Sequence, residues 1–138
     1  MDLKKLSKWF VISGTILIWL IKFGIRPFYD MGQPMNFFMG IAPNLAGSFL
    51  IPFGAFWLFS GREFPIARIF RIHSSADLRM VCILGFGMLV VNEYLQLIPV
   101  FGRTFDYFDI IASALGLTAS YFVFSKLSTA YNYRVTTR

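Results

Sequence analysis

Five polar side chains recur at short intervals within one of the most apolar parts of the chain. Glu93 is followed three residues later by Gln96, and Arg103, Asp106 and Asp109 are again three residues apart. On a helix, residues three apart lie on the same face. A carboxylate among apolar residues is costly unless it is paired, hydrated or protonated. The spacing therefore predicts one site at which these five side chains meet.

Further polar residues at one-turn spacing would complete the wall of such a site. Ser113 follows Asp109 by about one turn, and Asn44 and Ser48 are four residues apart in an earlier apolar block. Two basic residues, also four apart, stand near the end of the first apolar block. We expect a polar pocket whose ligand-binding residues are Arg26, Asn44, Ser48, Glu93, Gln96, Arg103, Asp106, Asp109 and Ser113, with Lys22 adding positive charge.

The chemistry open to these residues is limited by what the chain lacks. Paired carboxylates in a partly dry site do acid–base work, and in an enzyme the catalytic residues would be Glu93 as base and Asp109 as its ionised partner. The single histidine, His73, is expected in the connection on the opposite side of the membrane, and the single cysteine, Cys82, near that same end of the third span. The sequence contains no classical nucleophilic set and no standard zinc site, and it identifies no cofactor. Whether it is an enzyme at all stays open.

The segments that carry these residues have the length and composition of membrane spans. The chain has 138 residues, of which 57% are hydrophobic and 14% charged. Its four apolar blocks cover residues 8–25, 41–59, 80–100 and 107–127. Each is long enough to cross a hydrocarbon core of about 30 Å, and backbone groups in lipid must bond within their own helix. We predict an all-α membrane protein, residues 1–138 forming one domain of four transmembrane helices in an up-down bundle.

The basic residues predict how the bundle is oriented. With four spans, both termini and the second connection share one side, and cytoplasmic connections are enriched in Lys and Arg. Most basic residues fall on that side: Lys4, Lys5, Lys8, Arg62, Arg68, Arg71, Arg79, Lys126, Arg134 and Arg138. We expect cytoplasmic termini, a multi-pass protein of a bacterial inner membrane, and a pocket facing the outside. The net charge of +6 then serves lipid contact, and no nucleic-acid motif is present.

The connections carry their own signals. Residues 61–79 alternate apolar and basic side chains, which is typical of a short helix at a cytoplasmic membrane surface. Ser74 and Asp77 form a Ser-x-x-Asp start for the third span. The aromatic first connection, residues 26–40, is expected to lie in the outer headgroup region.

Purely structural explanations compete with the functional ones. Asp106 is suited to cap the fourth helix, with Asp109 favoured by the helix dipole. Arg103 can extend to lipid phosphate, although its planar fork also suits a phosphoryl group. Glu93, if protonated and bonded to Gln96, would hold two helices together.

The run NEYLQ…GRTFDYFDIIASALG resembles the signature of VanZ-like membrane proteins: a Glu, a Gln three later, then Arg-x-x-Asp-x-x-Asp, a small residue and a Gly. The likeness covers the last third to half of the chain, and APNLAGSFLIPF resembles an earlier helix of some members. Ser113 stands where the family usually has Asn. The resemblance implies a cell-envelope protein, and the founding member is associated with resistance to the glycopeptide teicoplanin.

Three functions follow from these observations. The first is binding of a lipid-linked wall precursor or another amphiphile at the outer leaflet, which would affect susceptibility to a glycopeptide-like compound. The second is a small membrane enzyme acting on a lipid or cell-wall intermediate. The third is a transporter or structural subunit, although transport by so short a chain would require an oligomer. The sequence leaves the ligand and the oligomeric state open.

Overall fold

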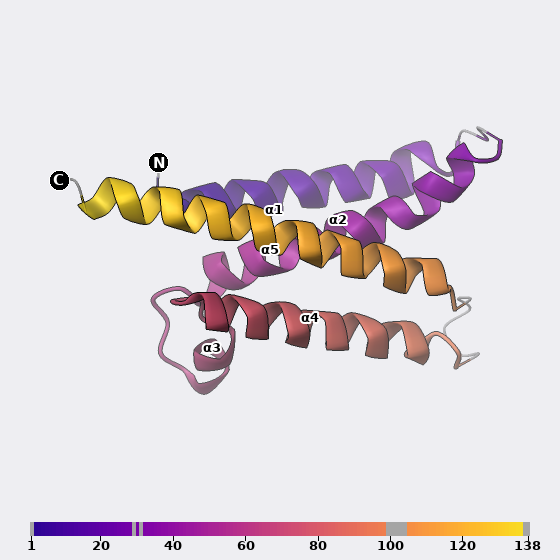
Figure 1. The fold of residues 1–138 in the computed structure, drawn as a ribbon. Helices are drawn as coiled ribbons and strands as arrows, with labels where there is room; N and C mark the ends of the chain where they lie inside the picture. The colour runs from indigo at the N-terminus through magenta and orange to yellow at the C-terminus, as the bar shows by residue number, and fades with distance from the viewer. Residues whose placement is uncertain (1, 29, 31, 99–104, 137–138) are drawn as a thin grey trace.

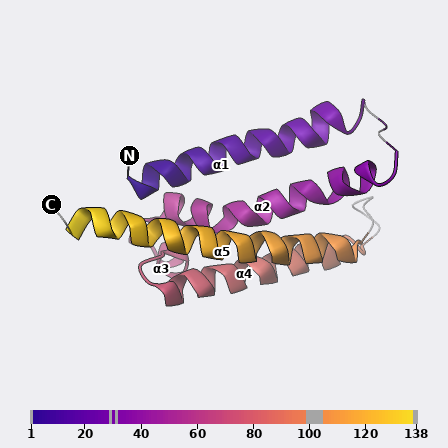
Figure 2. The ribbon, with the colours of Figure 1, turned by 45° about the horizontal axis from the view of Figure 1, so that its top comes forward.

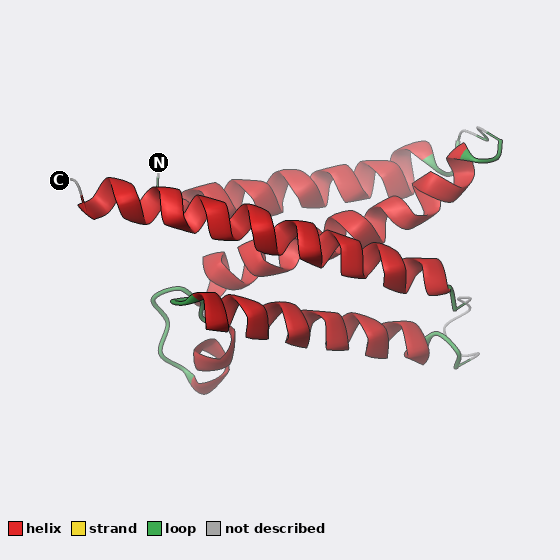
Figure 3. Cartoon of the chain, in the orientation of Figure 1, coloured by secondary structure: helices red, strands yellow, loops and turns green. Residues whose placement is uncertain are grey.

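The computed structural model describes residues 2–28, 30, 32–98 and 105–136. In this part of the chain every regular element is a helix (Figure 3). The elements are α1 (Leu3–Trp19), the π-helix η1 (Leu20–Ile25), α2 (Met35–Phe59), α3 (Pro65–Phe70), α4 (Ser75–Leu95) and α5 (Tyr107–Thr136). Four segments are long and apolar enough to cross a membrane: Leu3–Ile25, Met35–Phe59, Ser75–Leu95 and Tyr107–Tyr131. The prediction of an all-α protein with four membrane helices is confirmed.

The four long helices form an up-down bundle with α2 and α5 at its centre. Both termini lie at one end, together with α3, and the α1–α2 and α4–α5 connections lie at the other (Figure 1). Of all pairs of helices, α2 and α5 have the most extensive contact, and α2 also packs on α1 and α4. Helix α1 stands apart, because it packs mainly on α2, barely meets α5 and has no contact with α4 among the described residues (Figure 2).

The helices begin and end at other residues than the apolar blocks indicated. Helix α1 starts at Leu3 rather than residue 8, and α2 at Met35 rather than residue 41. Helix α4 covers Ser75–Leu95 instead of 80–100, and α5 continues to Thr136 instead of 127. The reason is that hydropathy marks the part of a helix that fits the hydrocarbon, whereas caps and backbone hydrogen bonds decide where the helix ends. Residues 99 and 100 lie outside the described residues.

Local capping explains where α1 and α4 begin. The Asp2 carboxylate accepts a 2.7 Å hydrogen bond from the backbone N–H of Lys5. At α4, Ser74 Oγ accepts from the Asp77 N–H at 3.2 Å and Asp77 Oδ2 accepts from the Ser74 N–H at 2.9 Å, which together form a capping box. The predicted Ser-x-x-Asp helix start is therefore confirmed. The short helix predicted in the second connection is present as α3.

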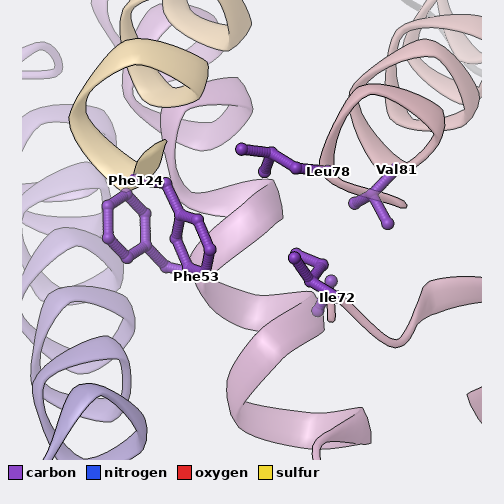
Figure 4. Packing of buried hydrophobic residues seen from close by; sticks show 6 residues of the cluster. Phe53, Ile72, Leu78, Val81 and Phe124 are labelled. Carbon is purple, nitrogen blue, oxygen red and sulfur yellow. The ribbon is translucent and has the colours of Figure 1, made fainter. Parts of the chain in front are cut away.

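The packed core lies toward the end of the bundle that carries the termini. Phe53 of α2 and Phe124 of α5 are fully buried, with ring centroids 5.3 Å apart and the rings nearly perpendicular. Leu78 and Val81 of α4 and Ile72 approach α2 beside them (Figure 4). Many large apolar side chains elsewhere on the spans are exposed in the isolated chain. In a bilayer such side chains face lipid, so the exposure fits a membrane-embedded bundle.

Candidate functional site

Glu93 is buried in the last turn of α4, and its two oxygens are both occupied. Only 5% of the residue is exposed. Its Oε2 accepts a 2.7 Å hydrogen bond from Gln96 Nε2, and its Oε1 accepts a 3.1 Å bond from the backbone N–H of Asp106. The third span was expected to continue to residue 100, which would place Glu93 well inside the helix, but α4 ends at Leu95. Glu93 instead connects the end of α4 to the start of α5.

Asp106 stands immediately before α5 and caps it. Its Oδ1 accepts a 2.9 Å hydrogen bond from the Phe108 N–H, and its carbonyl accepts from the Asp109 N–H at 3.2 Å. This satisfies two of the N–H groups that a helix start leaves unpaired. The structural explanation for Asp106 therefore holds. It does not compete with the functional one, since Asp106 also borders the cavity described next.

A polar cavity of about 520 Å³ lies at the end of the bundle opposite the termini. All four spans and the α1–α2 connection contribute to it. Nine of its thirteen lining residues are polar or charged: Lys22, Arg26, Gln33, Asn36, Asn44, Asn92, Gln96, Asp106 and Asp109. The others are Phe37, Gly40, Ile41 and Pro43. A hydrophilic recess between apolar helices suits an amphiphilic ligand, with a polar headgroup and an apolar remainder.

The charges in the cavity are divided between two walls. The positive charges come from Lys22 in η1 and from Arg26, the first residue after η1. The negative charges come from Asp106 and Asp109 at the start of α5. Within the described ranges no ion pair joins either cation to either carboxylate. The amides between them both donate and accept hydrogen bonds. The cavity can thus receive an anionic group on one side and hydrogen-bond donors on the other.

The predicted ligand-binding residues divide into three groups. Five of them line the cavity: Arg26, Asn44, Gln96, Asp106 and Asp109. Three are buried and are not among the lining residues: Ser48, Glu93 and Ser113. Arg103 lies outside the described residues, so its part in the site stays a prediction.

Ser48 has a packing role that its position in the sequence did not reveal. It is completely buried, and its hydroxyl donates a 2.9 Å hydrogen bond to the Leu45 carbonyl of its own helix. A Cβ atom on Gly116 of α5 would overlap both Ser48 Oγ and that carbonyl. One turn further, Ser120 Oγ donates a 2.6 Å bond to the Phe49 carbonyl. Small residues thus bring α2 and α5 close together beneath the cavity.

Three lining residues were missed by the sequence analysis: Gln33, Asn36 and Asn92. Asn92 precedes Gln96 by four residues, so the spacing that singled out Glu93 and Gln96 also placed Asn92 on a shared face. Asn36 was assigned to a connection because α2 was expected to start at residue 41. Since α2 starts at Met35, Asn36, Gly40 and Asn44 form a ladder of one-turn steps along the cavity. The sequence has no side-chain cap before Met35 that would have indicated this helix start.

The turn before α2 is ordered by its own hydrogen bonds. Asp30 Oδ1 accepts from Asn36 Nδ2 at 2.7 Å and from the Gly32 N–H at 3.1 Å. These bonds, the one from Asn36 first, hold the pKa of Asp30 below its usual range. Gly32 has a positive φ of 69°, which a residue with a side chain rarely adopts. The turn directs the chain into α2 so that Asn36 reaches the cavity.

The single histidine and the single cysteine lie away from the cavity. His73 is exposed next to the start of α4, at the end of the bundle away from the cavity, and Cys82 is half-buried in α4. No group of three His, Cys, Asp or Glu residues in the described part of the chain could hold a metal ion.

No family model, curated protein or solved structure matches this chain.

Proposed function

We propose that this chain is a VanZ-like protein of the bacterial cell envelope that binds a lipid-linked wall precursor or a similar amphiphile at the outer leaflet. The observation that carries the proposal is the cavity of about 520 Å³ to which all four spans contribute polar side chains. Keeping unpaired polar groups beside the hydrocarbon region is costly, so membrane proteins place them where they bind a substrate, an ion or each other.

The orientation of the bundle supports an external site. Basic residues gather at the end with the termini, and the positive-inside rule makes that end cytoplasmic. The cavity lies at the opposite end, which is the side on which lipid-linked precursors meet wall-assembling enzymes and glycopeptide-like compounds. A protein holding such a precursor would change the access of the compound to its target.

The charges in the cavity favour a headgroup with a phosphoryl group. Arg26 and Lys22 would bind the phosphoryl oxygens, because a guanidinium presents paired N–H donors to them. Asp106, Asp109 and the amides would accept from hydroxyl or amide groups of the remaining headgroup. Glu93 would act as a positioning residue, since it holds Gln96 and the start of α5 in place.

Binding is favoured over the enzymatic alternative by the position of Glu93. Both of its oxygens accept hydrogen bonds from within the protein, and it is not among the cavity-lining residues. A general base must reach the proton that it removes. Asp109, the other residue proposed for acid–base work, does line the cavity, so a reaction would have to depend on it without Glu93 in contact.

The proposal is tested by titrating the protein, in dodecyl maltoside micelles, with decyl phosphate. Arg26→Ala removes a charged hydrogen-bond donor from the cavity, and we expect the affinity to fall about tenfold or more. Arg62→Ala is the matched control, because Arg62 is an exposed arginine near the other end of the bundle. Calorimetry would measure both.

Two results would contradict the proposal. One is a wild-type protein that fails to bind decyl phosphate at any accessible concentration. The other is an equal loss of affinity in Arg26→Ala and Arg62→Ala, which would mean that charge alone attracts the probe.

A further inference from the structure

We propose that the hydrocarbon chain of the same ligand lies in an apolar groove between α1, α2 and α5, directly below the polar cavity. This inference rests on the proposed function and adds a binding site for the apolar part of the amphiphile. The groove has a volume of about 510 Å³, and nearly all of its lining is apolar, including Leu17, Leu45, Phe49 and Leu115.

The groove exists because α1 leans away from α5. Helix α1 packs on α2 and barely meets α5, and the two helices lie apart in Figure 2. The groove is lined by residues of all three helices on that side. The walls carry small residues where they would otherwise close it, such as Gly14, Ala46 and Ala119. Gly14 is also held close to Leu50, since a Cβ atom there would lie 2.6 Å from a Leu50 methyl carbon. Small residues thus keep the groove open between the larger apolar side chains that line it.

The groove and the cavity follow one another in the same order on all three helices. On α2 the cavity lining ends at Asn44 and the groove lining begins at Leu45. On the first span, groove residues reach Leu17 and cavity residues begin at Lys22. On α5 the cavity residue Asp109 precedes the groove residue Leu115 by less than two turns. The polar part thus lies toward the membrane surface and the apolar part deeper, which is how an amphiphile lies in a leaflet.

Two aromatic rings line the far part of the groove. Phe10 and Phe49 line it, and their ring centroids are 6.4 Å apart. From Leu17 down to Phe10 the groove extends along α1 for about 10 Å. It accepts a hydrocarbon segment of that length, and the remainder of a longer chain would extend into the bilayer. Phe37, from the aromatic segment expected in the outer headgroup region, borders the cavity rather than the groove.

A second apolar groove on the bundle provides a comparison. It lies between α4 and α5, and Thr118 and Phe86 are among its lining residues. On α4 its lining ends at Phe86, six residues before the cavity residue Asn92, and α2 contributes nothing to it. It therefore lacks the direct continuation that Asn44 and Leu45 of α2 give the first groove. General solvation by lipid would fill both grooves alike. A specific seat for the ligand's chain belongs only to the groove that continues from the cavity.

The inference is tested with two probes, butyl phosphate for the headgroup alone and decyl phosphate for headgroup and chain. Ala119→Trp fills the groove from an exposed position on α5. Thr118→Trp, at the preceding and also exposed residue, places the same indole in the groove between α4 and α5. Calorimetric titration of three proteins in dodecyl maltoside gives the affinities. Partition of decyl phosphate into micelles is common to all three, so ratios between them report on the protein.

We expect Ala119→Trp to lower the affinity for decyl phosphate about tenfold, because the decyl chain loses its packed contacts. The affinity for butyl phosphate should stay unchanged. Thr118→Trp should leave both unchanged. The retained affinity of Ala119→Trp for butyl phosphate also shows that this variant is folded. Equal affinities of Ala119→Trp and wild type for decyl phosphate, or equal losses in the two tryptophan variants, would overturn the groove and leave the headgroup cavity standing. A wild-type protein that binds neither probe would instead overturn the proposed function.

Discussion

Glu93 is a buried carboxylate that joins two helices at the cavity without lining the cavity itself. It accepts one hydrogen bond from a side chain of its own helical turn and one from the backbone at the start of the next helix. Both donors are half-buried, and a donor shielded from water that loses its acceptor costs more than the bond itself contributes. The position of Gln96 in the cavity wall and the start of α5 therefore depend on the same side chain.

Replacing Glu93 should separate its structural role from a catalytic one. Glu93→Ala leaves two donors unsatisfied, and we expect a loss of roughly 2–5 kcal/mol in the free energy of unfolding. Glu93→Gln keeps an acceptor for the Asp106 N–H and should lose about 1 kcal/mol. Denaturant unfolding in micelles, followed by circular dichroism, would measure both. Equal stability of Glu93→Ala and wild type would contradict the assigned role.

Helices α2 and α5 form the pair on which the rest of the bundle is built. Their close approach depends on small residues and on serine hydroxyls. Gly116 lies against Ser48 and the Leu45 carbonyl, and Ser120 donates a hydrogen bond to the Phe49 carbonyl. In lipid, where apolar side chains gain nothing from leaving water, close packing and hydrogen bonds supply the association of helices. The cavity and the groove both lie against this pair, so its spacing sets their width.

A methyl group at Gly116 should push the central pair apart. We expect Gly116→Ala to lower the free energy of unfolding by about 1–3 kcal/mol, since backbone atoms of α2 cannot move aside as a side chain can. It should also weaken the binding of decyl phosphate. Gly87→Ala is the matched control in α4, because a Cβ atom there meets nothing within 4 Å. That change should be neutral or should stabilise its helix by up to about 1 kcal/mol. Similar destabilisation by both would contradict the contact assigned to Gly116, because helix propensity favours alanine at both positions.

The whole molecule has a packed half and an open half. The aromatic and aliphatic core centred on Phe53 and Phe124 lies toward the termini, and the polar cavity lies at the other end. The packed core and the cavity therefore occupy different parts of the bundle. Its use in the cell depends on which end faces the cytoplasm, and the distribution of basic residues predicts that the core end does.

The orientation is tested with single cysteines in a Cys82→Ala background. Phe28→Cys places a thiol at an exposed residue of the cavity end, and Glu63→Cys places one at an exposed residue of the α3 end. In intact spheroplasts a membrane-impermeant maleimide should label the first and not the second, and lysis should make both reactive. The reverse pattern would place the cavity in the cytoplasm and would remove the proposed encounter with wall precursors.

Local properties of the chain were enough to predict the four spans, the start of α4 and the capping role of Asp106. Length, apolarity and the need to bond every backbone group in lipid leave little choice but helices, and a Ser-x-x-Asp pattern acts over a single turn. One-turn spacing also brought Gln96, Asp106 and Asp109 into one predicted site. These features depend only on neighbours in the sequence, so no knowledge of the packing was needed.

Which polar side chains face the cavity was decided by the packing of the helices. Ser48, Glu93 and Ser113 have the residue types of a site, but contacts between helices bury them behind the lining. Asn36 reaches the cavity because α2 begins at Met35, and the groove is open because α1 leans away from α5. The direction of a side chain within a bundle depends on how each helix is rotated, shifted and tilted against the others. Those quantities arise from contacts between residues far apart in the sequence, which no local pattern records.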